Sequence, residues 1–198
     1  MEIVDFLVIC SLIIFYILFL GRTFLLYKKG IKVWVIGTST KNIFEIILEN
    51  ILIPVLILWT TFVVLTVMNI NFPKIVSIYL IDAFWLKYLG IMFCYFGLLV
   101  FLLALISFGK AWRIGIDEKN SKDLITGGIF KYTRNPIFLF MDIYFFSISL
   151  IYPNFVLVVI AFCMIIGIHF QIIREENFLE SKFGKKYDEY KRKTRRYI

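Results

Sequence analysis

Two polar stretches in this sequence hold the residue types that can bind a ligand and carry chemistry. The first, DLITGGIFKYTRNP at residues 123–136, contains paired glycines and ends in Arg-Asn-Pro. The second, REENFLESKFGKKYDEY at residues 174–190, opens with an arginine and two carboxylates directly after an apolar run. Charged groups beside membrane-length apolar segments are costly to place and usually have a function. A helical hairpin formed by residues 137–173 would bring the two stretches together.

The composition indicates an all-α integral membrane protein. Hydrophobic residues make up 61% of the chain and charged residues only 18%. A helix that spans a bilayer needs about 20 mostly apolar residues. The apolar runs predict five transmembrane helices: Ile3–Leu20, Ile51–Met68, Tyr88–Phe108, Pro136–Tyr152 and Phe155–Ile173.

The basic residues predict the orientation of these helices. Alternate loops hold 20 and 2 of the 22 Lys and Arg residues. Because loops rich in Lys and Arg stay in the cytoplasm, the N-terminus is expected outside and the C-terminus in the cytoplasm. The net charge of +8 therefore reflects membrane topology, and no nucleic-acid partner is expected.

Several classes of site are not predicted. The sequence contains no GxGxxG, Walker, HExxH or CxxC motif. Its three cysteines stand singly within apolar runs, so neither a disulfide nor a metal site is expected. The first apolar run lacks the positively charged start and the cleavage site of a signal peptide, and is interpreted as a retained helix.

The segment after residue 174 is predicted to form a cytoplasmic amphipathic helix. Leu179, Phe183, Tyr187 and Tyr190 recur at spacings of four, four and three residues, which place them on one helix face. The basic residues that follow, Lys191–Arg196, are interpreted as a contact with anionic lipids.

Taken together, WRIGIDE, LITGGIFKYTRNPIF, REENFL and FGKKYDEY resemble the C-terminal half of the isoprenylcysteine carboxyl methyltransferase family, which is related to phospholipid methyltransferases. The resemblance covers residues 109–198 and divides the chain into an N-terminal transmembrane region, 1–108, and a methyltransferase-like region, 109–198. It implies that S-adenosylmethionine binds at the cytoplasmic face without a Rossmann sheet. The pocket would be closed by the loop before the hairpin and the helix after it.

The resemblance also implies roles for individual residues. The implied cofactor contacts are Lys122, Asp123, Leu124, Ile125, Phe130, Asn135, Phe138 and Glu175. Arg134 can hold a carboxylate through two hydrogen bonds, and Glu176 is the nearest base for an amine or thiol acceptor; these two are the expected catalytic residues. Gln171 and Arg174 are the expected substrate contacts.

Four positions depart from the family pattern. The best-known members have His at the position of Asn135 and Tyr at those of Phe130 and Phe138. The methyl-ester-forming members also have Arg at the position of Gln171, which is tied to the carboxylate substrate. Asn135 still donates and accepts hydrogen bonds, and Arg174 lies one turn after Gln171. The departures therefore bear on the acceptor more than on the cofactor.

The predicted reaction is methyl transfer from S-adenosylmethionine to a lipid-borne or prenylated acceptor that enters from the bilayer. Two alternatives stay open: an NADPH-dependent sterol-type reductase, which shares a related hairpin, and a non-enzymatic membrane module. If these residues have no catalytic or binding role, Arg134 only fixes the orientation of the adjoining span in the membrane, and Glu175 and Glu176 begin a solvated helix.

Asp142 and His169 are the ionisable residues, apart from tyrosine, within the fourth and fifth predicted spans. Counted from the cytoplasmic ends of the hairpin, they lie at similar depth, roughly 9 Å and 6 Å. One hypothesis is that they meet, directly or through water, beside an acceptor tunnel. The alternative is a hydrogen bond that only clamps two helices.

Overall fold

The computed structural model describes residues 2–34, 43–70, 78–81, 83–113 and 123–198, and only the backbone of residues 43–52. Within these residues the chain is helical and has no β-strand beyond isolated bridges. The α-helices are α1 (Ile3–Lys28), α2 (Ile43–Val67), α3 (Phe84–Phe108), α4 (Pro136–Ile151), α5 (Phe155–Phe183) and α6 (Lys185–Lys193). Two short 3-10 helices, η1 (Gly109–Ala111) and η2 (Gly128–Lys131), lie in the connection between α3 and α4.

Three of the helices are long and apolar enough to span a membrane: α1, α3 together with η1, and α5. The chain is therefore an integral membrane protein. In α2 the apolar part with described side chains is Ile53–Val67, and α4 has 16 residues. A helix of that length extends about 24 Å, less than the ~30 Å hydrocarbon core. Helices α2 and α4 correspond to the second and fourth predicted spans, and that these two cross the membrane stays a prediction.

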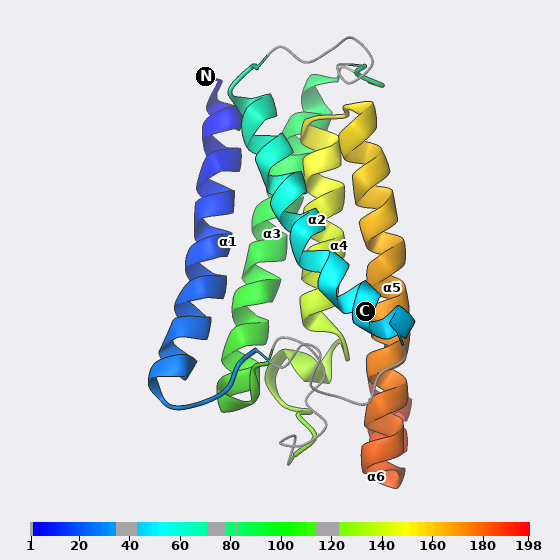
Figure 1. Ribbon diagram of the computed structural model, residues 1–198. Coiled ribbons are helices and arrows are strands. Elements are labelled where there is room, and N and C mark those ends of the chain that lie inside the picture. Colours follow the sequence, from blue (N-terminus) through cyan, green and yellow to red (C-terminus); the bar gives the residue numbers. More distant parts are fainter. Residues whose placement is uncertain (1, 35–42, 71–77, 82, 114–122) are drawn as a thin grey trace.

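The helices form a bundle in which α3 and α4 run side by side and α2 crosses at an angle (Figure 1). Aromatic rings fill the interior: the Phe101 ring stacks on Phe140 at 4.6 Å, and Phe15 of α1 packs against both. Gly90 lets α3 approach α4 closely, because an added β-carbon there would lie 2.8 Å from the Ser147 carbonyl oxygen.

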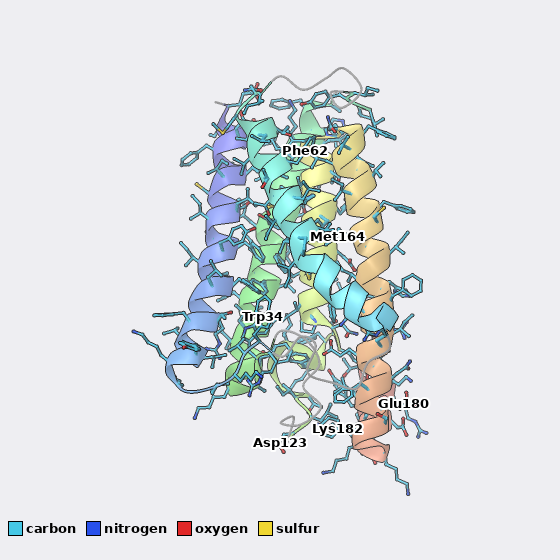
Figure 2. The ribbon with its side chains drawn as sticks, viewed as in Figure 1. Trp34, Phe62, Asp123, Met164, Glu180 and Lys182 are labelled. Atoms are coloured by element: carbon cyan, nitrogen blue, oxygen red, sulfur yellow. The ribbon has the colours of Figure 1, made fainter. Side chains whose placement is uncertain are left out.

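Backbone hydrogen bonds join the segment before α3 to the turn between α4 and α5. The Leu80 amide donates to the Pro153 carbonyl at 2.8 Å, and the Phe155 amide donates to Ile78 at 2.9 Å. Both connections therefore lie at one end of the bundle. At the opposite end lie η2, the last turns of α5 and α6 (Figure 1), and Figure 2 shows Asp123 and Lys182 there.

Helix α5 continues ten residues beyond the predicted end of the span at Ile173. Arg174, Glu175 and Glu176 are compatible with helical backbone and do not interrupt it. The helix ends at Gly184, whose φ of +50° lies in the left-handed region that glycine adopts readily. The predicted tail helix is thus divided between α5 and α6, and both carboxylates are held on a rigid helix.

Candidate functional site

Glu176 of α5 lies at the centre of an ionic cluster that joins the two polar stretches. Its Oε1 accepts hydrogen bonds from Arg134 Nε at 3.1 Å and Nη2 at 2.9 Å, and from Asn135 Nδ2 at 3.1 Å. Its Oε2 accepts from Arg196 Nη2 at 2.8 Å and Nε at 3.2 Å. The side chains of Glu176 and Arg134 are 4% and 8% exposed, so their pairing is sheltered from solvent.

Arg134 also binds the C-terminal tail. Its Nη1 donates to the Thr194 carbonyl at 2.6 Å and to the Lys191 carbonyl at 3.2 Å, and its backbone amide donates to Arg195 at 3.0 Å. Arg134 therefore ties the loop before α4 to α5, to α6 and to the tail. A ligand carboxylate at this guanidinium would compete with bonds inside the protein.

The loop that carries Arg134 is shaped by a glycine and by aromatic packing. Gly128 has a φ of +61°, and an added β-carbon would collide with Ser107 Oγ, which accepts from the Ile129 amide at 3.2 Å. The buried Phe130 ring packs edge-on against Phe108 at 4.8 Å. The loop then enters α4 at Pro136, a favourable first helical residue.

Tyr190 of α6 fastens this loop from the other side. Its hydroxyl donates to the Phe130 carbonyl at 2.7 Å. Burial raises the pKa of the Tyr190 phenol to about 12, so the hydroxyl remains a donor at neutral pH. Phe130, Tyr187 and Tyr190 form a small apolar cluster against which Leu124 and Ile125 pack.

The residues predicted to contact the cofactor occupy different environments. Asn135 is buried and bonded to Glu176, Phe138 is half-buried against the main core, and Glu175 is half-buried one residue before Glu176. Asp123 is exposed at the end of the bundle. Lys122 lies outside the described residues.

A small polar ligand fits the chemistry of this end of the molecule. The Tyr187 ring packs in the apolar cluster with Phe130, and its buried hydroxyl has no hydrogen-bond partner among the described residues. Residues 124–126 have no regular secondary structure, so their backbone amides are not part of a helix or strand ladder. The carboxylates of Asp123 and Glu175 can accept hydrogen bonds, and a hydroxyl or a free backbone amide can donate them, so this end of the molecule carries groups that could bind a polar ligand.

The two predicted substrate residues contact each other. Arg174 Nη1 donates to Gln171 Oε1 at 3.0 Å, and the Gln171 side chain is buried on α5. Arg174 thus reaches back one turn to the position at which the methyl-ester-forming family members carry an arginine.

The sequence predicts that Arg196 belongs to a basic segment that contacts lipid, and the structure shows that its guanidinium binds Glu176. That hydrogen bonding raises the pKa of the Arg196 guanidinium further. The backbone of the tail pairs with the loop at Thr133 and Arg195, and the Thr133 hydroxyl donates to the Arg196 carbonyl at 3.1 Å. No periodic pattern in the sequence marks these contacts, because the partners lie in three separate segments.

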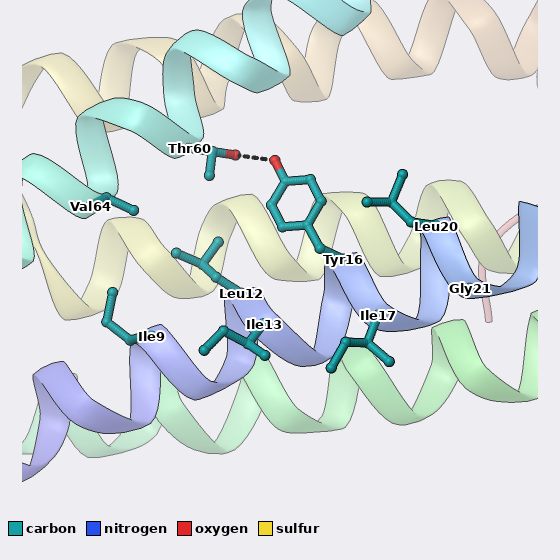
Figure 3. Close-up of a pocket in the computed structure, with 9 residues that line it drawn as sticks. All are labelled: Ile9, Leu12, Ile13, Tyr16, Ile17, Leu20, Gly21, Thr60 and Val64. Atoms are coloured by element: carbon teal, nitrogen blue, oxygen red, sulfur yellow. Dashed lines mark hydrogen bonds between the residues drawn. The ribbon is translucent and has the colours of Figure 1, made fainter. Parts of the chain in front are cut away.

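An open apolar cavity of about 610 Å³ lies elsewhere, between α1 and α2 (Figure 3). Tyr16 and Thr60 join across it through their hydroxyl groups, which are 2.9 Å apart. None of its lining residues belongs to the predicted site. Among the described residues no group of three or more His, Cys, Asp or Glu side chains is arranged to hold a metal ion.

Comparison of the sequence with protein-family models assigns the chain to a family. A family model described as phospholipid methyltransferase matches residues 85–186, which is more than half of the chain. The chain therefore belongs to the phospholipid methyltransferase family, and the match includes Arg134, Asn135 and Glu176 of the ionic cluster.

Two similar proteins have been found. Protein-S-isoprenylcysteine O-methyltransferase of Schizosaccharomyces pombe is 27% identical over 129 residues, which are 63% of this chain and 53% of that protein. An uncharacterized protein of Haemophilus influenzae is 55% identical over 40 residues, 20% of this chain and 62% of that protein. The chain thus aligns with only about half to three-fifths of the length of these relatives.

Proposed function

We propose that this protein transfers a methyl group from S-adenosylmethionine to a lipid-borne acceptor at the cytoplasmic face of the membrane. The observation that carries the proposal is the ionic cluster of Arg134, Asn135, Glu176 and Arg196, because it joins the two stretches that bear the family's motif. Family membership and the likeness to an isoprenylcysteine O-methyltransferase support the same reaction.

The proposed cofactor pocket lies between the loop before α4 and the adjoining parts of α5 and α6. Asp123 and Glu175 would accept hydrogen bonds from ammonium and hydroxyl groups, and the amides near Leu124 and Ile125 would meet the edge of the base. Phe130 and Phe138 would bound the pocket with aromatic faces. Lys122 and Asn135 complete the proposed set of contacts.

S-adenosylmethionine, when bound, supplies a methyl group activated by a positively charged sulfur. The protein must align that methyl group with the acceptor and exclude water, so positioning supplies much of the rate acceleration. Arg134 and Glu176 are proposed to lie at the reaction centre, where their mutual bonds fix the loop against α5. Gln171 and Arg174, which are hydrogen-bonded to each other, are proposed to face the acceptor.

The acceptor is proposed to be a lipid or a prenylated molecule that reaches the site laterally from the bilayer. The outward faces of the helices are rich in exposed apolar side chains, for example Phe162 and Phe170 on α5. Such surfaces are stable in lipid and let an apolar molecule approach without crossing water.

Calorimetric titration of the detergent-purified chain tests the cofactor directly. The chain is titrated with S-adenosylmethionine, with its demethylated product and with NADPH. We expect the first two to bind and NADPH to give no heat. Binding of NADPH alone would favour the reductase, and absence of binding by all three would favour a non-enzymatic module.

A transfer assay tests the reaction itself. The purified chain is reconstituted with a membrane lipid extract and S-adenosylmethionine that carries a labelled methyl group. We expect the label to appear in the organic phase in proportion to the amount of protein. Cofactor binding without transfer to any lipid would contradict the proposed acceptor class.

A further inference from the structure

A second polar cluster lies deeper in the hairpin than the ionic cluster. It consists of Asp142 on α4, His169 on α5 and Tyr197 in the C-terminal tail. His169 Nδ1 is 3.0 Å from the Tyr197 hydroxyl oxygen, and the two rings are stacked with an interplanar angle of 15°. Asp142 Oδ1 is buried and has no hydrogen-bond partner among the described residues.

Helix geometry places Asp142 and His169 at the same level. Asn135 and Glu176 are joined at 3.1 Å near the mouth of the hairpin. Asp142 follows Asn135 by seven residues, and His169 precedes Glu176 by seven. Seven residues make almost two complete turns and about 10 Å of rise, so each residue lies on the same helix face as its counterpart. The second cluster therefore lies about two helical turns from the ionic cluster, along the same faces of α4 and α5.

The direct hydrogen-bond partner of His169 is Tyr197, and the hypothesis that water bridges Asp142 and His169 stays a prediction. No hydrogen bond joins Asp142 to His169 among the described residues, and the tail residue Tyr197 binds His169 instead. Tyr197 follows Arg196, which binds Glu176, so the tail connects the two clusters. Burial and the nearby Asp142 carboxylate both raise the pKa of the Tyr197 phenol.

An unpaired carboxylate oxygen at this depth is unfavourable unless it meets a donor. Glu176 is poorly suited to accept a proton. Two guanidinium groups and an amide already donate hydrogen bonds to its oxygens and favour its ionised form. Asp142 Oδ1, by contrast, is a buried carboxylate oxygen that meets no donor among the described residues.

We propose that Asp142, with His169 and Tyr197 beside it, accepts the hydrogen bond and then the proton of the acceptor's nucleophile. The inference rests on the proposed function and narrows its acceptor to an amine or hydroxyl group that carries hydrogen. A carboxylate acceptor would place a second negative charge beside Asp142, which is unfavourable.

The balance of the step is simple. The acceptor's nitrogen or oxygen uses a lone pair to form the new bond to the methyl carbon. The bond between that carbon and sulfur breaks, and its electron pair stays on sulfur. The proton of the nucleophile passes to the Asp142 carboxylate, which becomes neutral.

The test compares variants and acceptors in the reconstituted full chain with labelled S-adenosylmethionine. Vesicles contain a lipid with a primary-amine, a hydroxyl or a carboxylate headgroup. We expect the parent protein to label the amine lipid or the hydroxyl lipid and to leave the carboxylate lipid unlabelled. Asp142→Asn should lower that transfer about 100-fold, the size of a lost general base, while cofactor affinity is unchanged.

A second variant in the cluster and a control variant outside it complete the test. Tyr197→Phe keeps the ring and removes the hydroxyl next to His169, and it should lower transfer about tenfold even if Asp142→Asn does not fold. Ser149→Ala is the matched control, because Ser149 follows Asp142 by seven residues on α4 and bonds only to its own helix.

Each outcome decides the inference. Full transfer by both Asp142→Asn and Tyr197→Phe overturns it, as does preferential labelling of the carboxylate lipid, and either result leaves the proposed function intact. If the variants lower only the melting temperature, the cluster is a helix clamp and the inference is wrong. If the parent binds no S-adenosylmethionine, the proposed function fails first, and the inference with it.

Discussion

Glu176 joins three segments of the chain, and its two arginine partners differ in burial. The Arg134 side chain is 8% exposed and that of Arg196 is 36% exposed. Removal of one partner from a buried ion pair costs about 3–5 kcal/mol, whereas partly exposed pairs contribute about 1 kcal/mol or less. Arg134→Ala should therefore lower the free energy of unfolding by several kcal/mol, and Arg196→Ala by much less. Denaturant unfolding in detergent measures both, and equal losses would contradict this ranking.

Glu175 provides the sharpest test of the proposed cofactor contacts. Glu175→Gln removes the charge but keeps the size of the side chain, so the fold should be retained. Loss of a charge-assisted hydrogen bond should weaken S-adenosylmethionine binding by ~1.5–3 kcal/mol. The exposed Lys193 provides the control, since Lys193→Ala removes a charge from α6 and should leave affinity unchanged. Binding of Glu175→Gln as tight as that of the parent would remove Glu175 from the site.

At the scale of the elements, the contact between α3 and α4 depends on Gly90. A β-carbon at this position would lie 2.6 Å from Ile151 Cγ1 and 2.8 Å from the Ser147 carbonyl oxygen, which cannot move aside cheaply. Gly90→Ala should therefore destabilise the protein by about 1–3 kcal/mol. Gly167→Ala on α5 is the matched control: its β-carbon meets no atom within 4 Å, and the change should be neutral or stabilising by up to ~1 kcal/mol. Thermal unfolding of both variants in detergent tests the pair.

The sequence predicted the elements better than it predicted their connections. The apolar runs located α1, α3 and α5, because membrane-length hydrophobicity is a local property. The sequence also predicted helix after Arg174, but not that this helix continues α5 without a break as far as Phe183. Charged residues mark the membrane surface and do not end a helix, whereas Gly184 does end it. The contacts of Arg196 and Tyr197 were also missed. They join residues 20 and 28 positions apart, and no periodicity reveals pairings of that kind.

At the scale of the whole molecule, the two ends of the bundle differ in charge. The segment before α3 and the turn between α4 and α5 lie together at one end, as the hydrogen bonds at Leu80 and Phe155 show. Residues 68–87, which include these connections and the first turn of α3, and residues 152–154 together contain 2 of the 22 Lys and Arg residues. The ionic cluster lies at the other end, with η2 and α6. The positive-inside rule therefore predicts that the cluster faces the cytoplasm.

Single-cysteine labelling in whole cells tests this orientation. The background replaces Cys10, Cys94 and Cys163 with alanine, and cysteine is then introduced at Leu80 or at Thr126. Both positions are exposed, which makes them accessible to a membrane-impermeant thiol reagent, whereas Asn154 in the turn is 3% exposed and unsuitable. Leu80→Cys should react in intact cells, and Thr126→Cys only after permeabilisation. The reverse pattern would place the ionic cluster outside the cell, away from cytoplasmic S-adenosylmethionine, and would contradict both the orientation and the proposed reaction.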